Sequence, residues 1–292
     1  MKSSNIGGQA VMEGVMMRNA DKYAVAVRKT DGEIVVKTEE YKGIVQNKKI
    51  RSLPIIRGVF SFIDSMVLGM STLTYSASFF MDEEEEEKDE KKESVMMGLT
   101  IACSVVMAVA IFMILPYFLS QLFRKFTDST TLITLLEGAV RLVIFFGYIL
   151  LISRMKDIQR VFMYHGAEHK CINCIEHGME LNVENVLKSS RLHKRCGTSF
   201  LFIVMIVSII FFLFIRIESP IWRVVFRLLL IPVIAGVSFE FIRLAGKSEN
   251  KLVILLSKPG MMLQKLTTRE PDASMAEVAI ASVEAVFDWR AY

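Results

Sequence analysis

The sequence YHGAEHK at residues 164–170 contains two histidines and a glutamate in the order H-x-x-E-H. In a helix, at roughly 100° per residue, His165 and His169 project from one face one turn apart, with Glu168 beside them. Two imidazoles placed in this way can bind one zinc ion, and the carboxylate can take a proton from a water on that ion. The same order defines the inverted zincin motif. The stretch therefore predicts a zinc site with Glu168 as general base.

A second stretch, HKRCGTS at residues 193–199, supplies further candidate ligands. His193 and Cys196 are three positions apart and share one face if the segment is helical. Together with the histidines of the first stretch they form a nitrogen–sulfur set suited to tetrahedral zinc. Glu240 is another candidate for the third ligand, because a carboxylate near the end of an apolar segment needs an explanation. Three protein ligands would leave a position for water and four would close the site, and both possibilities stay open.

The composition indicates a membrane protein. The chain has 292 residues, of which 52% are hydrophobic, and its mean hydropathy is +0.41. Its apolar residues form long runs, and residues 95–123 contain no charged side chain, which exceeds the ~20 residues that a helix needs to cross a bilayer. Further spans are predicted at 130–153, 197–215 and 221–244. No basic and aromatic pattern of the kind that binds nucleic acid is present.

The regions outside these runs complete a mostly α-helical, polytopic organisation. Residues 1–52 predict a small β-rich cytoplasmic unit, with a hairpin turn at Asp31-Gly32. Residues 53–80 predict an amphipathic interfacial helix, with a fifth span as the alternative. The glutamate-rich residues 81–94 predict a solvated linker. Residues 95–245 form a four-span membrane domain that contains the H-x-x-E-H loop 154–199. Residues 246–292 form a cytoplasmic tail, interrupted at Pro259-Gly260, with a helix within 272–289.

The distribution of lysine and arginine predicts the orientation in the membrane. Residues 1–57 carry eleven of these residues and residues 154–196 carry eight, whereas residues 124–133 carry two. Because basic residues accumulate on the cytoplasmic side, four spans with both termini cytoplasmic satisfy this distribution. The H-x-x-E-H segment then lies at the cytoplasmic face, between the second and third spans.

Several blocks of the chain resemble the YqhQ family of bacterial membrane proteins. They are GGQAVMEGVMMR at 7–18, HGAEHK at 165–170, RCGTSF at 195–200, TTREP at 267–271 and EVAI at 277–280. That family is described as a predicted metal-dependent enzyme of unknown function, so the resemblance implies a metal site in the bacterial inner membrane without naming a substrate. The usual His-Pro-Arg-Cys of the family reads His193-Lys194-Arg195-Cys196 here, and Cys171 and Cys174 do not belong to its pattern.

Three functions are compatible with these features. The first is a zinc-dependent hydrolase that cleaves a peptide or a lipid-linked amide or ester at the cytoplasmic face. The second is a membrane platform for a protein or peptide partner, with a closed structural metal site in place of a catalytic one. The third is a transporter component that uses intramembrane charges, among which Glu137 and Arg141 are four residues apart and are expected to pair. Glu240 and Arg243 are the corresponding charges of the last span.

Overall fold

The computed structural model describes residues 4–80, 90–215, 217, 219–247 and 250–292. The chain divides into two compact units. The sheet unit comprises residues 1–80, 152–203 and 235–292, and the helical unit comprises residues 81–151 and 204–234. The expected mostly helical chain with an N-terminal antiparallel sheet is confirmed.

The sheet is an antiparallel meander in which each strand pairs with the next one in sequence. Its strands are β1 (Gly7–Val11), β2 (Gly14–Asn19), β3 (Lys22–Arg28) and β4 (Ile34–Glu40). The predicted hairpin at Asp31-Gly32 joins β3 to β4, with Val27 opposite Val35. Gly32 has φ +90°, a conformation that a residue without a Cβ adopts at little cost.

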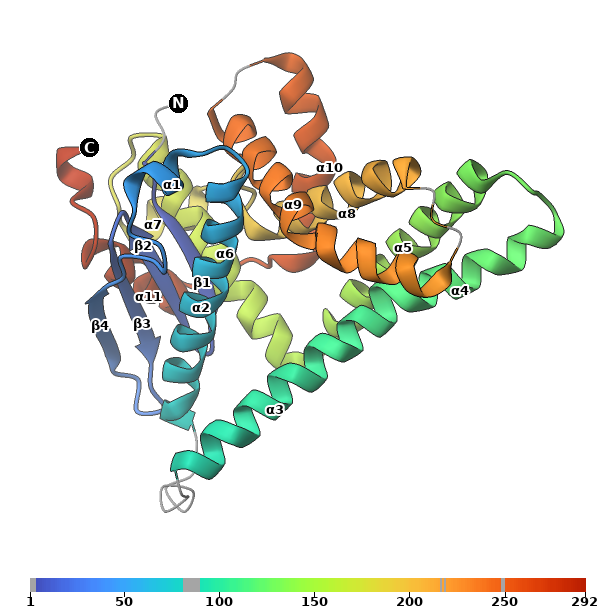
Figure 1. The fold of residues 1–292 in the computed structure, drawn as a ribbon. Coiled ribbons are helices and arrows are strands. Elements are labelled where there is room, and N and C mark those ends of the chain that lie inside the picture. The colour runs from blue at the N-terminus through green and yellow to red at the C-terminus, as the bar shows by residue number, and fades with distance from the viewer. Residues whose placement is uncertain (1–3, 81–89, 216, 218, 248–249) are drawn as a thin grey trace. The chain divides into compact units, whose positions relative to one another are not determined.

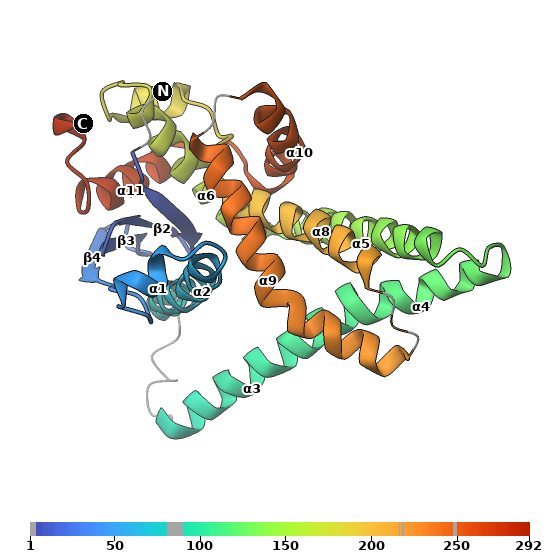
Figure 2. The same ribbon diagram turned by 45° about the horizontal axis from the view of Figure 1, so that its top comes forward.

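Helices cover both faces of this sheet (Figures 1 and 2). On one face, Leu68 of α2 (Ile56–Ala77) joins a buried cluster of strand residues, which are Val11, Met16, Tyr23, Val25 and Val27. On the other face lie α6 (Lys156–Glu176) and α11 (Ala273–Glu284). Val15 and Met17 of β2 pack there against Tyr164 and Ala167 of α6, which are 1% and 0% exposed. The helix that carries H-x-x-E-H is therefore fixed against a rigid sheet.

Among the residues that the structure describes, five helices are long and apolar enough to cross a membrane. They are Ile56–Phe80, Val95–Lys125, Thr130–Ile152, Gly197–Phe214 and Ile221–Gly246. The last four correspond to the predicted spans, and the first is the segment predicted as interfacial or as a fifth span. Within that first helix, Asp64 is buried and accepts hydrogen bonds from the Tyr41 hydroxyl (3.1 Å) and the Ile44 N–H (2.8 Å).

The structure gives the following bounds for the helices that have not yet been named by label. They are α1 (Lys48–Ser52), α3 (Glu90–Val109), a π-helical turn (Ala110–Ile114), α4 (Leu115–Gln121), α5 (Thr130–Ile152), α7 (Val183–Lys188), α8 (Gly197–Phe214), α9 (Pro220–Lys247) and α10 (Lys251–Thr267). Of the predicted acidic linker, residues 81–89 lie outside the described residues, and Glu90 already belongs to α3.

The predicted interruption at Pro259-Gly260 is wrong, because α10 continues through both residues. Proline in a helix removes one backbone hydrogen bond, so other contacts must hold the helix together. Beyond the proline, the Gln264 amide donates to the His193 carbonyl (2.7 Å) and to the Ser199 hydroxyl (2.8 Å). These tertiary contacts outweigh the local signal of the sequence.

Candidate metal centre

The structure brings together three of the predicted ligands. His165 and His169 lie one turn apart on α6, and Cys196 lies directly before α8. One ligand atom from each residue lies within 4.8 Å of the others. The His165 Nε2 atom is 3.2 Å from the Cys196 Sγ atom. Two imidazole nitrogens and one sulfur are the donor set that zinc favours, so these residues fit that ion.

Backbone carbonyls fix the orientation of both imidazoles. The His165 Nδ1–H donates to the carbonyl of Thr267 (2.8 Å), and the His169 Nδ1–H donates to the carbonyl of Arg191 (2.7 Å). A hydrogen bond at one ring nitrogen determines which tautomer forms and leaves the other nitrogen with its lone pair. In the neutral rings both Nε2 atoms can therefore act as ligands, and metal binding would displace the proton that the His165 Nε2 atom shares with Cys196.

Electrostatics in the group favour a thiolate. Burial by itself raises the pKa of the Cys196 thiol, but His165 and His169 outweigh it and bring that pKa well below its usual value. Burial lowers the pKa of His165, whereas Cys196 acts in the opposite direction and raises it to about 9. Since the thiolate is the form of cysteine that binds metal, the cluster holds Cys196 ready for coordination.

Glu168 lies on the side of α6 that faces β1. Its side chain is 5% exposed. A Cβ atom added at Gly8 of β1 would lie 2.9 Å from the Glu168 Cγ atom, so only glycine lets the strand pass this close. At Gly7 such an atom would meet nothing within 4 Å, so the close approach is confined to Gly8. Burial raises the pKa of Glu168, and a raised pKa makes a carboxylate a stronger proton acceptor.

Glu240 pairs with a residue outside the His165–His169–Cys196 group, whereas the His193 ring lies beside His169, with the ring centroids 5.8 Å apart, and turns its Nε2 atom toward Glu176. The His193 Nε2 atom lies 3.4 Å from a carboxylate oxygen of Glu176. Glu240 pairs with Arg57 through both carboxylate oxygens. Within the described residues, the structure therefore brings Cys196 to the two α6 histidines and directs the other two candidates to different partners.

Glu176 ties the chain terminus to this region. It accepts hydrogen bonds from the N–H and the hydroxyl of Ser4, each at 2.8 Å, and forms an ion pair with Arg195. Burial acts to raise the pKa of Glu176, but hydrogen bonds from His193 and Ser4 and the charge of Arg195 lower it to about 2. Glu176 therefore remains ionised and holds Arg195, next to Cys196, in place.

Sequence reasoning missed the groups that orient the ligands. The carbonyls of Thr267 and Arg191 could not have been found, because every residue has a carbonyl and only the fold decides where it points. Gly166 could have indicated that another segment approaches the helix here, because a glycine lies between the two histidine positions. A Cβ atom there would lie 2.0 Å from the Arg269 carbonyl oxygen, so this glycine lets the segment that contains Thr267 reach α6.

We expect Gly166→Ala to disturb the site and the fold together. The added methyl group would push the 267–271 segment away from α6, at a cost of about 1–3 kcal/mol of unfolding free energy. Thermal unfolding and zinc content of the purified protein measure both effects. Gly197→Ala is the matched control, since a Cβ atom there meets nothing within 4 Å. Equal behaviour of the two variants would contradict the close approach at Gly166.

The fold and the site together define a class: a mostly helical chain, with five membrane-length helices in its described part, in which a cysteine joins two histidines of a sheet-backed helix. The family model described as "Protein of unknown function (DUF1385)" matches residues 53–289. The chain is also 37% identical over 287 residues to "Uncharacterized protein YqhQ" of Bacillus subtilis (strain 168), which covers 94% of this chain and 90% of that protein. The chain therefore belongs to this uncharacterised family. No solved structure matches it.

Proposed function

We propose that this protein is a polytopic protein of the bacterial inner membrane with a zinc-dependent hydrolytic site at its cytoplasmic face. The observation that carries the proposal is the convergence of His165, His169 and Cys196, each with a ligand atom within 4.8 Å of the others, with both imidazoles oriented by backbone carbonyls. The buried carboxyl of Glu168 on the same helix supplies a proton acceptor. The five membrane-length helices support the membrane location, and the distribution of basic residues supports cytoplasmic termini.

The roles of the residues follow from their chemistry. His165, His169 and Cys196 would hold the zinc ion, which supplies Lewis acidity toward a carbonyl group and toward water. Glu168 accepts a proton from the attacking water and returns it to the leaving group, for which its raised pKa is suited. The Thr267 and Arg191 carbonyls keep the imidazoles in the tautomer that binds metal. A peptide or a lipid-linked amide or ester suits this chemistry.

Glu168→Gln tests the catalytic role. The variant should retain zinc, because Glu168 is not a ligand, and should lose hydrolysis by a factor on the order of 10²–10⁴. The assay compares the detergent-purified variant and wild type, each with and without zinc, on a p-nitrophenyl ester and a quenched fluorescent peptide. Glu184→Gln, which alters an exposed carboxylate on α7, is the control. Hydrolysis that is independent of zinc, or equal rates in the wild type and Glu168→Gln, would contradict the proposal.

A structural metal site is the second candidate function, and the burial of two of the three residues favours it. His169 is 1% exposed and Cys196 is 6% exposed, as in sites that hold a fold together. In that case the metal joins α6 to the start of α8, and the protein serves as a platform for a membrane or peptide partner. His165→Ala would then destabilise the protein, while Glu168→Gln would have little effect on any property.

A further inference from the structure

The outer face of α10 has the composition of a membrane-surface helix. Four apolar side chains at helical spacing are exposed there: Leu252 (62%), Leu255 (57%), Leu256 (50%) and Met262 (63%). The adjoining side of the helix is buried and includes Ser257, Gly260, Leu263, Gln264 and Thr267. A helix in water does not gain stability from an apolar stripe of this kind, so the stripe indicates an apolar surrounding.

Three lysines accompany the apolar stripe. Lys251, Lys258 and Lys265 are exposed and follow one another at intervals of seven residues, which keeps them on one side of the helix within about 20° per interval. The sequence from 251 to 269 contains no acidic residue. Long basic side chains beside an apolar stripe can extend to lipid phosphates while the apolar groups insert between the lipids.

The position of α10 within the sheet unit matches this composition. The helix starts shortly after the apolar part of α9, which ends at Gly246. Its inner face contacts the first turn of α8, where a Cβ atom on Gly260 would lie 3.1 Å from the Cβ atom of Ser199. The ends of two apolar helices therefore adjoin α10, and this is where the hydrocarbon region of a bilayer meets its headgroups.

We propose that α10 binds in the plane of the membrane interface, with its apolar stripe among the acyl chains and its lysines on the phosphates of anionic lipids. The inference rests on the membrane placement of α8 and α9 in the proposed function, and it does not require the metal. The buried face of the same helix ends at Thr267, whose carbonyl holds His165. The side of α10 proposed to contact lipid and the side that holds a candidate metal ligand thus adjoin each other on a single helix.

Site-directed spin labelling of the reconstituted full-length protein tests the proposal. Cysteines replace Leu255, Met262 or Lys258 in a Cys103→Ser background, because Cys103 is exposed and the other three cysteines are buried. In vesicles of phosphatidylcholine and phosphatidylglycerol, labels at 255 and 262 should be more accessible to oxygen than to a water-soluble nickel chelate. The label at 258 should show the reverse. Preferential access of the nickel chelate at 255 and 262, or protection from both reagents, would overturn the proposal.

Two controls distinguish a failure of the membrane placement from a failure of the role of α10. A label at Val106 of α3, which is 69% exposed, reports whether the apolar helices are embedded at all. Oxygen access at 106 without oxygen access at 255 and 262 would refute the role of α10 alone. Replacing Lys251, Lys258 and Lys265 by Gln should make the depth of the label at 255 independent of the phosphatidylglycerol fraction. The control variant replaces three exposed lysines elsewhere in the sheet unit, Lys22, Lys42 and Lys188, and its label at 255 should still change depth with the phosphatidylglycerol fraction. Equal results for the two triple variants would refute the contact with anionic lipid.

Discussion

Wild-type protein is expected to contain stoichiometric zinc after purification, and His169→Ala protein is expected to contain none. The substitution removes a nitrogen donor that the Arg191 carbonyl holds in place, and two remaining ligands from different segments do not retain zinc through purification. Elemental analysis of detergent-purified protein measures the metal content directly. Replacement of zinc by cobalt adds a second readout, because a thiolate ligand gives a charge-transfer absorption that Cys196→Ser should abolish.

The other histidines supply matched controls for this experiment. His177 follows α6 at its C-terminal end, and its Nδ1–H donates to the Asn173 carbonyl (2.7 Å), so His177→Ala should leave the zinc content unchanged. His193→Ala and Glu240→Gln should also retain zinc, because His193 contacts Glu176 and Glu240 pairs with Arg57. If His169→Ala keeps its metal, or if His193→Ala loses it as completely, the ligand group must be different from the one described.

The parts of the fold that the sequence predicts are those with a strong local cause. Long apolar runs mark four of the membrane-length helices, because no other structure buries such a run. Asp31-Gly32 marks a hairpin, because a tight turn needs a residue that tolerates positive φ. The H-x-x-E-H order implies a shared helical face, and α6 places His165 and His169 on that face. In each case the decisive interactions lie within a few residues of one another.

The remaining features depend on contacts between distant segments. Cys196 and Glu240 were equivalent candidates from the sequence, and Arg57, 183 residues before Glu240, is what pairs with the carboxylate. Residues 53–80 are apolar enough for a span, but the sequence does not reveal that Leu68 packs against a sheet built from residues 7–40. The continuation of α10 through Pro259 depends on Gln264 reaching His193. Pattern reasoning has no access to such pairings.

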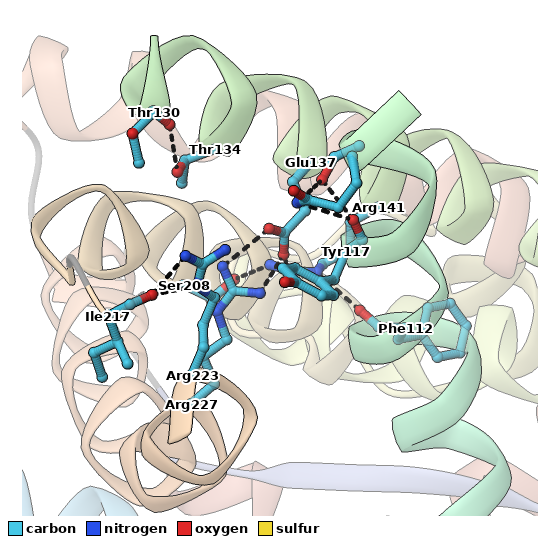
Figure 3. A network of polar contacts seen from close by, with 12 residues as sticks. Phe112, Tyr117, Thr130, Thr134, Glu137, Arg141, Ser208, Ile217, Arg223 and Arg227 are labelled. Atoms are coloured by element: carbon cyan, nitrogen blue, oxygen red, sulfur yellow. Dashed lines mark hydrogen bonds and ion pairs between the residues drawn. The ribbon is translucent and has the colours of Figure 1, made fainter. Parts of the chain in front are cut away.

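Glu137→Gln is expected to cause the largest loss of stability in the helical unit. Glu137 is 3% exposed and accepts hydrogen bonds from Arg227 of α9 and from Arg141 of its own helix, each with a contact of 2.9 Å (Figure 3). Arg141 also donates a hydrogen bond to the Phe112 carbonyl (2.8 Å). This carbonyl lacks its usual helical donor, because the residue four positions further on is Pro116, which has no N–H. One carboxylate thus balances two buried guanidinium groups that connect several helices.

Removing this charge leaves two buried cations without a partner, for which the expected cost is about 3–5 kcal/mol of unfolding free energy. Denaturant-induced unfolding in detergent micelles measures the loss. Ser208→Ala is the control, because it removes only the hydrogen bonds of a neutral hydroxyl, one of 3.3 Å from Arg141 and one of 2.7 Å to the Met205 carbonyl, and should cost far less. A second substitution, Arg227→Met, should restore part of the stability of Glu137→Gln, since it removes one of the two uncompensated charges. If Glu137→Gln is as stable as wild type, or if Arg227→Met worsens it additively, the network does not hold the helices together through charge balance.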